Sequence, residues 1–208
     1  MIISDIKIYK INFKIKSSRK IHYKTFNKIQ NIFVVIETNE NLIGIGEATP
    51  IKSITGDLKK NTHRLLSLAK TNLKGCDPCD IKSIHGILRN NSQKLRLTSS
   101  TAMNAIDSAC YDLMGKSKKK PIYQLIRNCR SKNVLNTVTI YLGSLENTVN
   151  DVFNVMTKYH RCGIKRIKLK LSGQPKIDKK RVLTVTKLFS GNLTLDANEA
   201  YRDERLAV

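Results

Sequence analysis

Two lysines separated by a single residue are the first groups in this sequence that could carry proton-transfer chemistry. Lys168 and Lys170 lie in the segment 166–171, where basic and apolar residues alternate, and this alternation places both lysines on one face of a strand. Two ammonium groups held close in a partly dry cavity repel each other, and burial and repulsion both lower a lysine pKa. A lysine tuned in this way can act as a general base near neutral pH. The alternative is a half-exposed strand whose lysines are solvated.

A second polar pair follows on the next predicted strand. Asp196 and Asn198 share one face of the segment 193–198, with apolar residues on the other face. An acid and an amide at the C-terminal end of a parallel strand lie where α/β barrels build their active sites. Oxygen ligands of this kind suit a hard cation such as Mg²⁺. The alternative is that Asp196 caps the turn after the strand.

The elements that must position these residues fall into two groups. In the first group, alternating and β-branched segments predict three strands, with a tight polar turn at residues 39–41. Apolar residues at helical spacing then predict a series of helices. The expected strands are 2–15, 32–38 and 42–48, and the expected helices are 57–74, 80–90, 99–116 and 122–127.

From about residue 130 onward, predicted strands and helices alternate. Such alternation implies parallel strands joined by crossover helices. The sequence therefore predicts an α+β capping domain over residues 1–128, followed over residues 129–208 by the first βαβαβ units of an incomplete (β/α) barrel of the TIM type. The expected strands are 134–140, 166–171 and 192–197, and the expected helices are 146–159 and 176–189.

The charge balance narrows the possible partners. The chain has 38 Lys and Arg against 16 Asp and Glu, a net charge of +22, and the densest basic runs are residues 116–120 and 179–181. Basic residues are spread along the whole chain without a stripe of base-stacking aromatics, so we expect no specific nucleic-acid partner. So high a charge should still give salt-dependent association with polyanions. No apolar run approaches the ~20 residues of a membrane helix, and without a recognisable secretory signal we expect a cytoplasmic location.

Cys76 and Cys79 have the C-x-x-C spacing of a zinc or redox half-site. No second pair of this kind follows, and a structural zinc needs four ligands. Because Gly75 and Pro78 lie beside the cysteines, we interpret the segment as a turn between two helices.

Taken together, these segments resemble the muconate-lactonizing-enzyme subgroup of the enolase superfamily, above all dipeptide epimerases such as L-Ala-D/L-Glu epimerase. The Lys168-x-Lys170 strand, followed by Asp196 and Asn198, is the first part of the resemblance. The stretch 44–50 with Ile54-Thr55-Gly56-Asp57 is similar to the capping-domain loop of these epimerases. The stretches 100–116 and 121–125 are similar to the long capping-domain helix and the entry to the barrel.

The resemblance implies an isomerase that removes and returns a proton α to a carboxylate bound to Mg²⁺. By this resemblance, Lys170 would be the acid/base catalyst on one face of the substrate. Lys168 would lower the pKa of Lys170 and contact the substrate carboxylate or the developing enolate. Asp196 would be the first metal ligand, and Asn198 would support it.

Two further residues would contact the substrate by the same resemblance. Thr139, at the end of the first barrel strand, would bind the substrate directly. Lys24, in a mobile capping loop, would bind a distal carboxylate.

More than one function remains open. The first is a Mg²⁺-dependent epimerase or racemase acting on a dipeptide. The loop 54–57 favours this function over a muconate cycloisomerase or an o-succinylbenzoate synthase. For a full-length parent protein, a homo-oligomer is one possible assembly. The second is a catalytically inactive truncated fragment, because the family draws further metal ligands from later strands and three strands cannot close an eight-stranded barrel. A basic nucleic-acid-binding module is a remote third.

Overall fold

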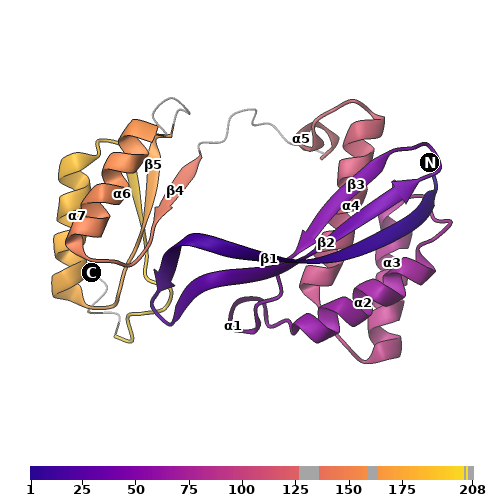
Figure 1. The fold of residues 1–208 in the computed structure, drawn as a ribbon, viewed down its shortest axis with the longest axis horizontal. Coiled ribbons are helices and arrows are strands. Elements are labelled where there is room, and N and C mark those ends of the chain that lie inside the picture. The colour runs from indigo at the N-terminus through magenta and orange to yellow at the C-terminus, as the bar shows by residue number, and fades with distance from the viewer. Residues whose placement is uncertain (127–135, 159–163, 204, 206–208) are drawn as a thin grey trace. The chain divides into compact units, whose positions relative to one another are not determined.

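The computed structural model describes residues 1–126, 136–158, 164–203 and 205. The chain divides into two compact units (Figure 1). Unit 1 comprises Met1–Phe13 and Ile29–Arg130, and unit 2 comprises Lys14–Lys28 and Ser131–Val208. The domain boundary that we predict between residues 128 and 129 lies outside the described residues.

Unit 1 is built from a sheet of order β1-β2-β3 and the helices that follow it. The predicted hairpin is confirmed, because β2 and β3 pair antiparallel from Ile32 opposite Ala48 to Glu37 opposite Ile43. The strands are β1 (Ile3–Ile21), β2 (Lys24–Thr38) and β3 (Ile43–Ala48), and the helices are α1 (Lys52–Thr55), α2 (Lys59–Asn72), α3 (Ile81–Leu95), α4 (Ser100–Ser117) and α5 (Ile122–Leu125). Only α1, a single turn, has no counterpart among the predicted elements.

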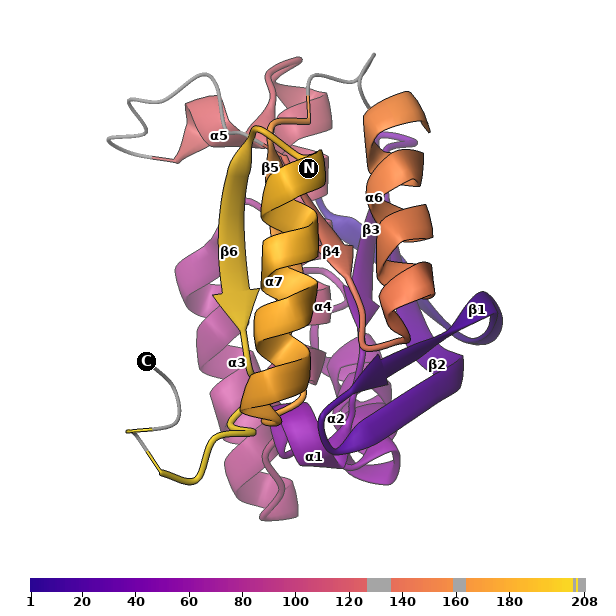
Figure 2. The same cartoon turned by 90° about the vertical axis from the view of Figure 1, so that its left-hand side faces the viewer.

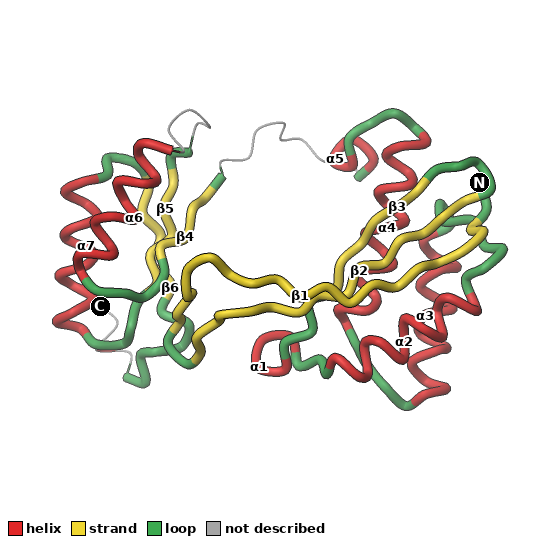
Figure 3. Tube along the Cα trace, in the orientation of Figure 1, coloured by secondary structure: helices red, strands yellow, loops and turns green. Residues whose placement is uncertain are grey.

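The β1–β2 hairpin is longer than the sequence predicts. Residues 16–31, which we expect to include a mobile loop at Lys24, are drawn in Figure 3 almost entirely as strand, and the turn falls at His22 and Tyr23. The expectation of a loop is therefore wrong. Most side chains described in this stretch are exposed or only half-buried, so the apolar alternation that reveals a half-buried strand is missing.

The close packing of β3 against α4 explains the two glycines of the Gly44-x-Gly46 segment. Both glycines lie on the buried face of β3. A Cβ atom at Gly44 would overlap the carbonyl oxygen of Ala109, and one at Gly46 would overlap the carbonyl oxygen of Ala105. Glycine on the strand and alanine on the helix thus let the two backbones approach each other.

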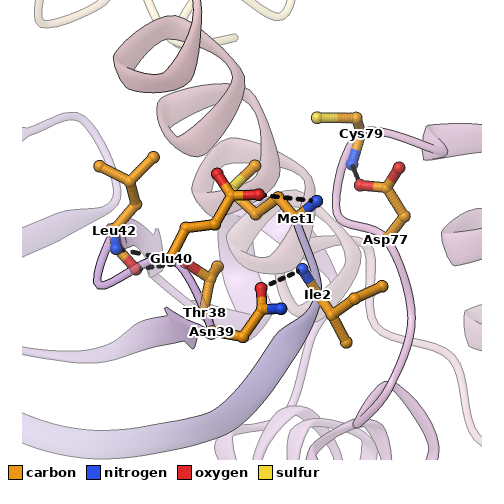
Figure 4. A network of polar contacts seen from close by, with 8 residues as sticks. All are labelled: Met1, Ile2, Thr38, Asn39, Glu40, Leu42, Asp77 and Cys79. Atoms are coloured by element: carbon orange, nitrogen blue, oxygen red, sulfur yellow. Dashed lines mark hydrogen bonds and ion pairs between the residues drawn. The ribbon is translucent and has the colours of Figure 1, made fainter.

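The turn between β2 and β3 also holds the start of the chain (Figure 4). The Asn39 side chain accepts a hydrogen bond from the backbone N–H of Ile2 at 2.8 Å. The terminal ammonium group of Met1 lies 3.0 Å from a Glu40 carboxylate oxygen, and this hydrogen bond raises the pKa of the ammonium group. These contacts fix the first residues of β1 beside the turn.

The segment around Cys76 and Cys79 forms a turn, as predicted. The Asp77 side chain accepts a hydrogen bond from the backbone N–H of Cys79 at 2.9 Å (Figure 4). Asp80 then caps α3 by accepting from the backbone N–H of Ser83. The polar groups of this segment are therefore used to end one helix and begin the next.

Unit 2 contains the predicted parallel sheet, of order β4-β5-β6. Its elements are β4 (Thr137–Ile140), α6 (Leu145–Lys158), β5 (Arg166–Lys170), α7 (Pro175–Leu188) and β6 (Asn192–Asp196). In Figures 1 and 2, α6 and α7 both lie on one face of this sheet. The core between these helices and the sheet consists of Ile140, Val152, Val155, Ile167, Leu169, Leu171 and Val185. Among the described residues, no helix is long and apolar enough to cross a membrane.

The space around each glycine predicts opposite effects for two glycine-to-alanine substitutions, one where β3 packs on α4 and one in α3. Gly46→Ala should lower the free energy of unfolding by about 1–3 kcal/mol, because the new methyl group overlaps helix backbone. Gly86→Ala, inside α3 with open space around its Cβ position, should raise it by about 0.5–1 kcal/mol. Urea unfolding of both variants measures the difference, and a Gly46→Ala chain as stable as the wild type would contradict this packing.

Candidate active site

The two lysines of β5 lie on the face of the sheet opposite the helices. Ile167 and Leu169 are fully buried in the core, whereas Lys168 and Lys170 alternate with them. The ammonium groups of both lysines reach the same atom: Oδ2 of Asp196 lies 2.6 Å from Lys168 Nζ and 2.8 Å from Lys170 Nζ. The shared face is thus as predicted, and it brings the three side chains into one cluster.

Asn198 completes the cluster from the segment after β6. Lys170 Nζ donates to Asn198 Oδ1 at 2.7 Å, and the Asn198 backbone N–H donates to Asp196 Oδ1 at 3.0 Å. Asn198 has a positive φ of 47°, in the left-handed region that asparagine tolerates better than most residues. We refer to Lys168, Lys170, Asp196 and Asn198 as the lysine–aspartate cluster.

The electrostatics of the cluster centre on Asp196. Hydrogen bonds from Lys168 and then from Lys170 hold the pKa of the Asp196 carboxyl well below its usual range, although burial opposes this effect. The sequence-based picture of two lysines that repel each other leaves out this carboxylate, whose negative charge offsets their repulsion. The lysines also differ in exposure, since 38% of the Lys168 side chain but only 11% of the Lys170 side chain is exposed.

Thr139 lies in the same sheet but beside a different feature. The register pairs Thr139 with Lys168. Thr139 also lines a cavity of about 870 Å³ formed by β4, α6 and Arg19. No residue of the lysine–aspartate cluster lines this cavity. The structure therefore places Thr139 both beside Lys168 in the sheet and in the lining of this cavity.

The hairpin tip supplies a cation to this cavity, and it is Arg19 rather than Lys24. The Arg19 guanidinium donates to the Tyr141 hydroxyl at 3.2 Å and lies 5.1 Å from the centre of the Tyr141 ring. The Lys24 ammonium group lies 5.1 Å from the centre of the Phe26 ring and does not line the cavity. No local pattern in the sequence distinguishes Arg19 from its basic neighbours, because its position depends on hairpin contacts.

Asp178, on α7, is a buried acid that organises the loop after β5. Its carboxylate accepts hydrogen bonds from the backbone N–H groups of Ser172 and Gly173, at 2.9–3.0 Å. It also accepts from the Tyr201 hydroxyl at 2.9 Å, and burial together with this bond raises the pKa of Tyr201 to about 12. Arg181, which follows Asp178 by three residues on α7, is also buried. In the sequence Arg181 belongs to the basic run 179–181, and nothing in that run indicates its burial.

The residues described here do not by themselves make up a binding site for Mg²⁺. Asp196 is the only carboxylate in the lysine–aspartate cluster, and both of its oxygens already accept hydrogen bonds from protein donors. Among the described residues, no group of three or more His, Cys, Asp or Glu side chains could hold a metal ion. Protein Mg²⁺ sites usually combine several oxygens with water, so one engaged carboxylate is not enough.

The fold defines a class of protein. An α+β unit followed by parallel βαβαβ units is the N-terminal arrangement of an enolase-superfamily protein. The family described as "Mandelate racemase / muconate lactonizing enzyme, N-terminal domain" matches residues 3–127, and the chain belongs to this family.

Individual relatives agree with this family. The hydrophobic dipeptide epimerase of Enterococcus faecalis is 30% identical over 207 residues, covering 97% of this chain and 55% of the relative. The N-succinyl-L-Arg/Lys racemase of Bacillus cereus is 28% identical, covering 98% of this chain and 54% of the relative. The chain thus spans about half the length of these curated relatives.

Solved structures extend the similarity to the fold. The E. faecalis dipeptide epimerase, crystallised with Mg and the dipeptide L-Leu-L-Tyr, matches with a TM-score of 0.83 and 29% identity over 97% of this chain and 55% of its own. The L-Ala-D/L-Glu epimerase of Bacillus subtilis, in a substrate-liganded complex, matches with a TM-score of 0.82 and 25% identity over 100% of this chain and 56% of its own. The predicted fold class is confirmed by these matches.

The lowered pKa of Asp196 predicts a pH-dependent contribution to stability. Because the folded-state pKa lies below the ordinary value of 3.8, the stabilisation is present above that pH and is lost as the pH falls toward the folded-state pKa. Asp196→Asn should therefore lower the free energy of unfolding by about 1.5–3 kcal/mol at pH 7, the size of a hydrogen bond to a charged group. The difference from the wild type should shrink below about pH 4. Urea unfolding from pH 3 to 7 measures it, and a pH-independent difference would contradict the ion-pair assignment.

Proposed function

We propose that this chain supplies the Lys-x-Lys part of the active site of a Mg²⁺-dependent epimerase or racemase. The reaction would be abstraction and return of a proton α to a substrate carboxylate. The observation that carries the proposal is the sharing of one Asp196 oxygen by Lys168 and Lys170. A basic strand that is only solvated would leave its lysines separate and exposed, whereas here only 11% of the Lys170 side chain is exposed and its ammonium group is held by two acceptors.

In this proposal Lys170 is the catalytic acid/base. Its ammonium group would return the proton to the α-carbon, and its neutral amine would remove that proton. Lys168, the more exposed of the two, keeps a positive charge near the place where negative charge develops on the substrate carboxylate. Asp196 orients both ammonium groups, and Asn198 holds Lys170 from a second direction.

Asp196 is also the residue of this chain that we propose as a ligand of Mg²⁺. Its carboxylate is the type of group that a hard cation binds. Because the described residues add no second carboxylate, the remaining ligands of the site would come from elsewhere in the parent enzyme. We therefore assign no reaction step to the ion.

The distal end of the substrate provides a further part of the proposal. We place Arg19 and Thr139 at this end, because both line the cavity beside β4. A guanidinium group can bind a carboxylate through two parallel hydrogen bonds. Lys24 stays a weaker candidate, since its ammonium group lies over Phe26.

A dipeptide is the substrate class that the relatives favour. Several curated relatives carry names of dipeptide epimerases, including those for hydrophobic dipeptides and L-Ala-D/L-Glu. The loop 54–57 gives less support than its sequence suggests, because Asp57 accepts from the backbone N–H of Thr101 at 2.8 Å and so satisfies a donor in the first turn of α4. Gly56 has a positive φ of 74° at the end of α1. Both residues thus have structural reasons to be present.

The second candidate, a chain without catalytic activity of its own, is favoured by one specific observation. The described residues provide a single cluster carboxylate where a Mg²⁺ site needs several oxygens. This candidate is compatible with the first, because the first also needs metal ligands that the described residues do not provide. Cytoplasmic location, homo-oligomerisation and the lack of a specific nucleic-acid partner remain predictions from the sequence.

The proposal predicts that Lys170 is required for exchange of the substrate α-proton with solvent. Residues 1–208 would be joined to the C-terminal part of the E. faecalis dipeptide epimerase that this chain does not cover. With Mg²⁺ and a hydrophobic dipeptide in D₂O, the hybrid should exchange the α-proton. Lys170→Ala should slow exchange roughly 100- to 10,000-fold, the usual contribution of a general acid/base. Proton NMR of the dipeptide measures the rate.

The matched control is Lys187→Ala, which removes an exposed lysine from the last turn of α7. Lys187 is not part of the lysine–aspartate cluster. It should leave the exchange rate unchanged. A Lys170→Ala hybrid that folds, as judged by circular dichroism, and exchanges as fast as the unmodified hybrid would refute the assignment.

A further inference from the structure

Arg181 is one of two deeply buried charged residues that α7 places behind the lysine–aspartate cluster, the other being Asp178. It is 2% exposed and is the bulkiest of the fully buried side chains. Burial lowers the pKa of its guanidinium group, while the charges of Asp178 and Asp151 oppose this shift. A buried guanidinium is costly unless its donors are satisfied, so the contacts of Arg181 indicate what the charge is used for.

The guanidinium group donates three hydrogen bonds, and two of them go to strand ends. Its Nε donates to the Thr148 hydroxyl at 3.0 Å. One terminal nitrogen donates to the Tyr141 carbonyl oxygen at 2.9 Å, just after β4, and the other donates to the carbonyl oxygen of Lys170 itself. A rigid planar fork therefore joins the C-terminal ends of two neighbouring strands.

Lys170 is consequently held at both ends. Arg181, from the helix side, binds its backbone carbonyl, and Asp196 and Asn198, on the opposite face, bind its ammonium group. The Lys170 side chain must therefore span the distance between its backbone, which Arg181 holds, and the oxygens of Asp196 and Asn198. A small shift of the strand end would move Nζ relative to its acceptors, and proton transfer is sensitive to such shifts.

We propose that Arg181 is the positioning residue for Lys170: by binding the Lys170 carbonyl it fixes where the ammonium group lies against Asp196 and Asn198. Arg181 is buried and contacts the backbone carbonyl of Lys170, not its ammonium group. Its importance for proton transfer rests on the proposed function, whereas its hold on the Lys170 backbone does not. The rival explanation is that Arg181 only stabilises unit 2, as any well-bonded buried charge would.

Asp178 provides a matched comparison for this rival explanation. It lies on the same side of α7, is also 2% exposed and is also fully engaged in hydrogen bonds. Its partners are Ser172, Gly173 and Tyr201, so it holds the loop after β5 and not the carbonyl of Lys170. Asp178→Asn should therefore weaken unit 2 without moving Lys170.

The test uses the 208-residue chain with ¹³C- and ¹⁵N-labelled lysine. The NMR signals of Lys170 Cε and its ammonium protons report how this side chain is held. Arg181→Gln should shift the Cε signal and speed ammonium-proton exchange with water about tenfold, the effect expected for weakening a charge-assisted hydrogen bond. Arg181→Lys, which keeps the charge with fewer donors, should fall between the wild type and Arg181→Gln. Asp178→Asn should lower the melting temperature and leave both Lys170 signals unchanged.

Each outcome separates positioning from mere stabilisation. Folded Arg181→Gln chains with wild-type Lys170 signals would overturn the proposal, as would Asp178→Asn chains with equally altered signals. Where Arg181→Gln does not fold, Arg181→Lys gives the same comparison. Because the measurement needs no substrate, it can fail while Lys170-dependent exchange succeeds, and it can succeed while the proposed function fails.

Discussion

The geometry of the candidate active site depends on the ion pairs that Lys168 and Lys170 both form with one oxygen of Asp196. They require β5 and β6 to be parallel neighbours in one register, with Lys170 opposite Asp196. They also require the apolar residues of β5 to face the helices, so that both lysines face away from them. One carboxylate thus converts three separate polar residues into a charged cluster with a defined geometry.

The cluster is supported by charges that lie behind the sheet. Asp178 and Arg181, on α7, hold the loop after β5 and the strand ends respectively. Buried charges are stable only when their hydrogen bonds are satisfied, so each of these residues restricts the backbone around it. The helix therefore contributes more than an apolar face: it sets the positions of the backbone atoms from which Lys170 extends.

Much of the fold follows from local patterns, and the exceptions have physical reasons. The alternation around Lys168 and the apolar spacing of α4 reveal their elements, because each has one buried face. The outer part of the β1–β2 hairpin has little such contrast, and its strands are therefore not apparent in the sequence. The burial of Arg181 is not apparent from its basic run, because it depends on the carbonyl groups of Tyr141 and Lys170, which are distant in sequence. The Asp196 bridge depends on a register that no local pattern shows.

A double-mutant cycle between Lys170 and Asp196 tests the central ion pair most directly. The free energies of unfolding of the wild type, Lys170→Met, Asp196→Asn and the double variant would be measured by urea at pH 7. The shared, partly buried geometry predicts a coupling of about 1–3 kcal/mol, larger than that for the more exposed Lys168. A coupling near zero for Lys170, with all four chains folded, would contradict the existence of the cluster.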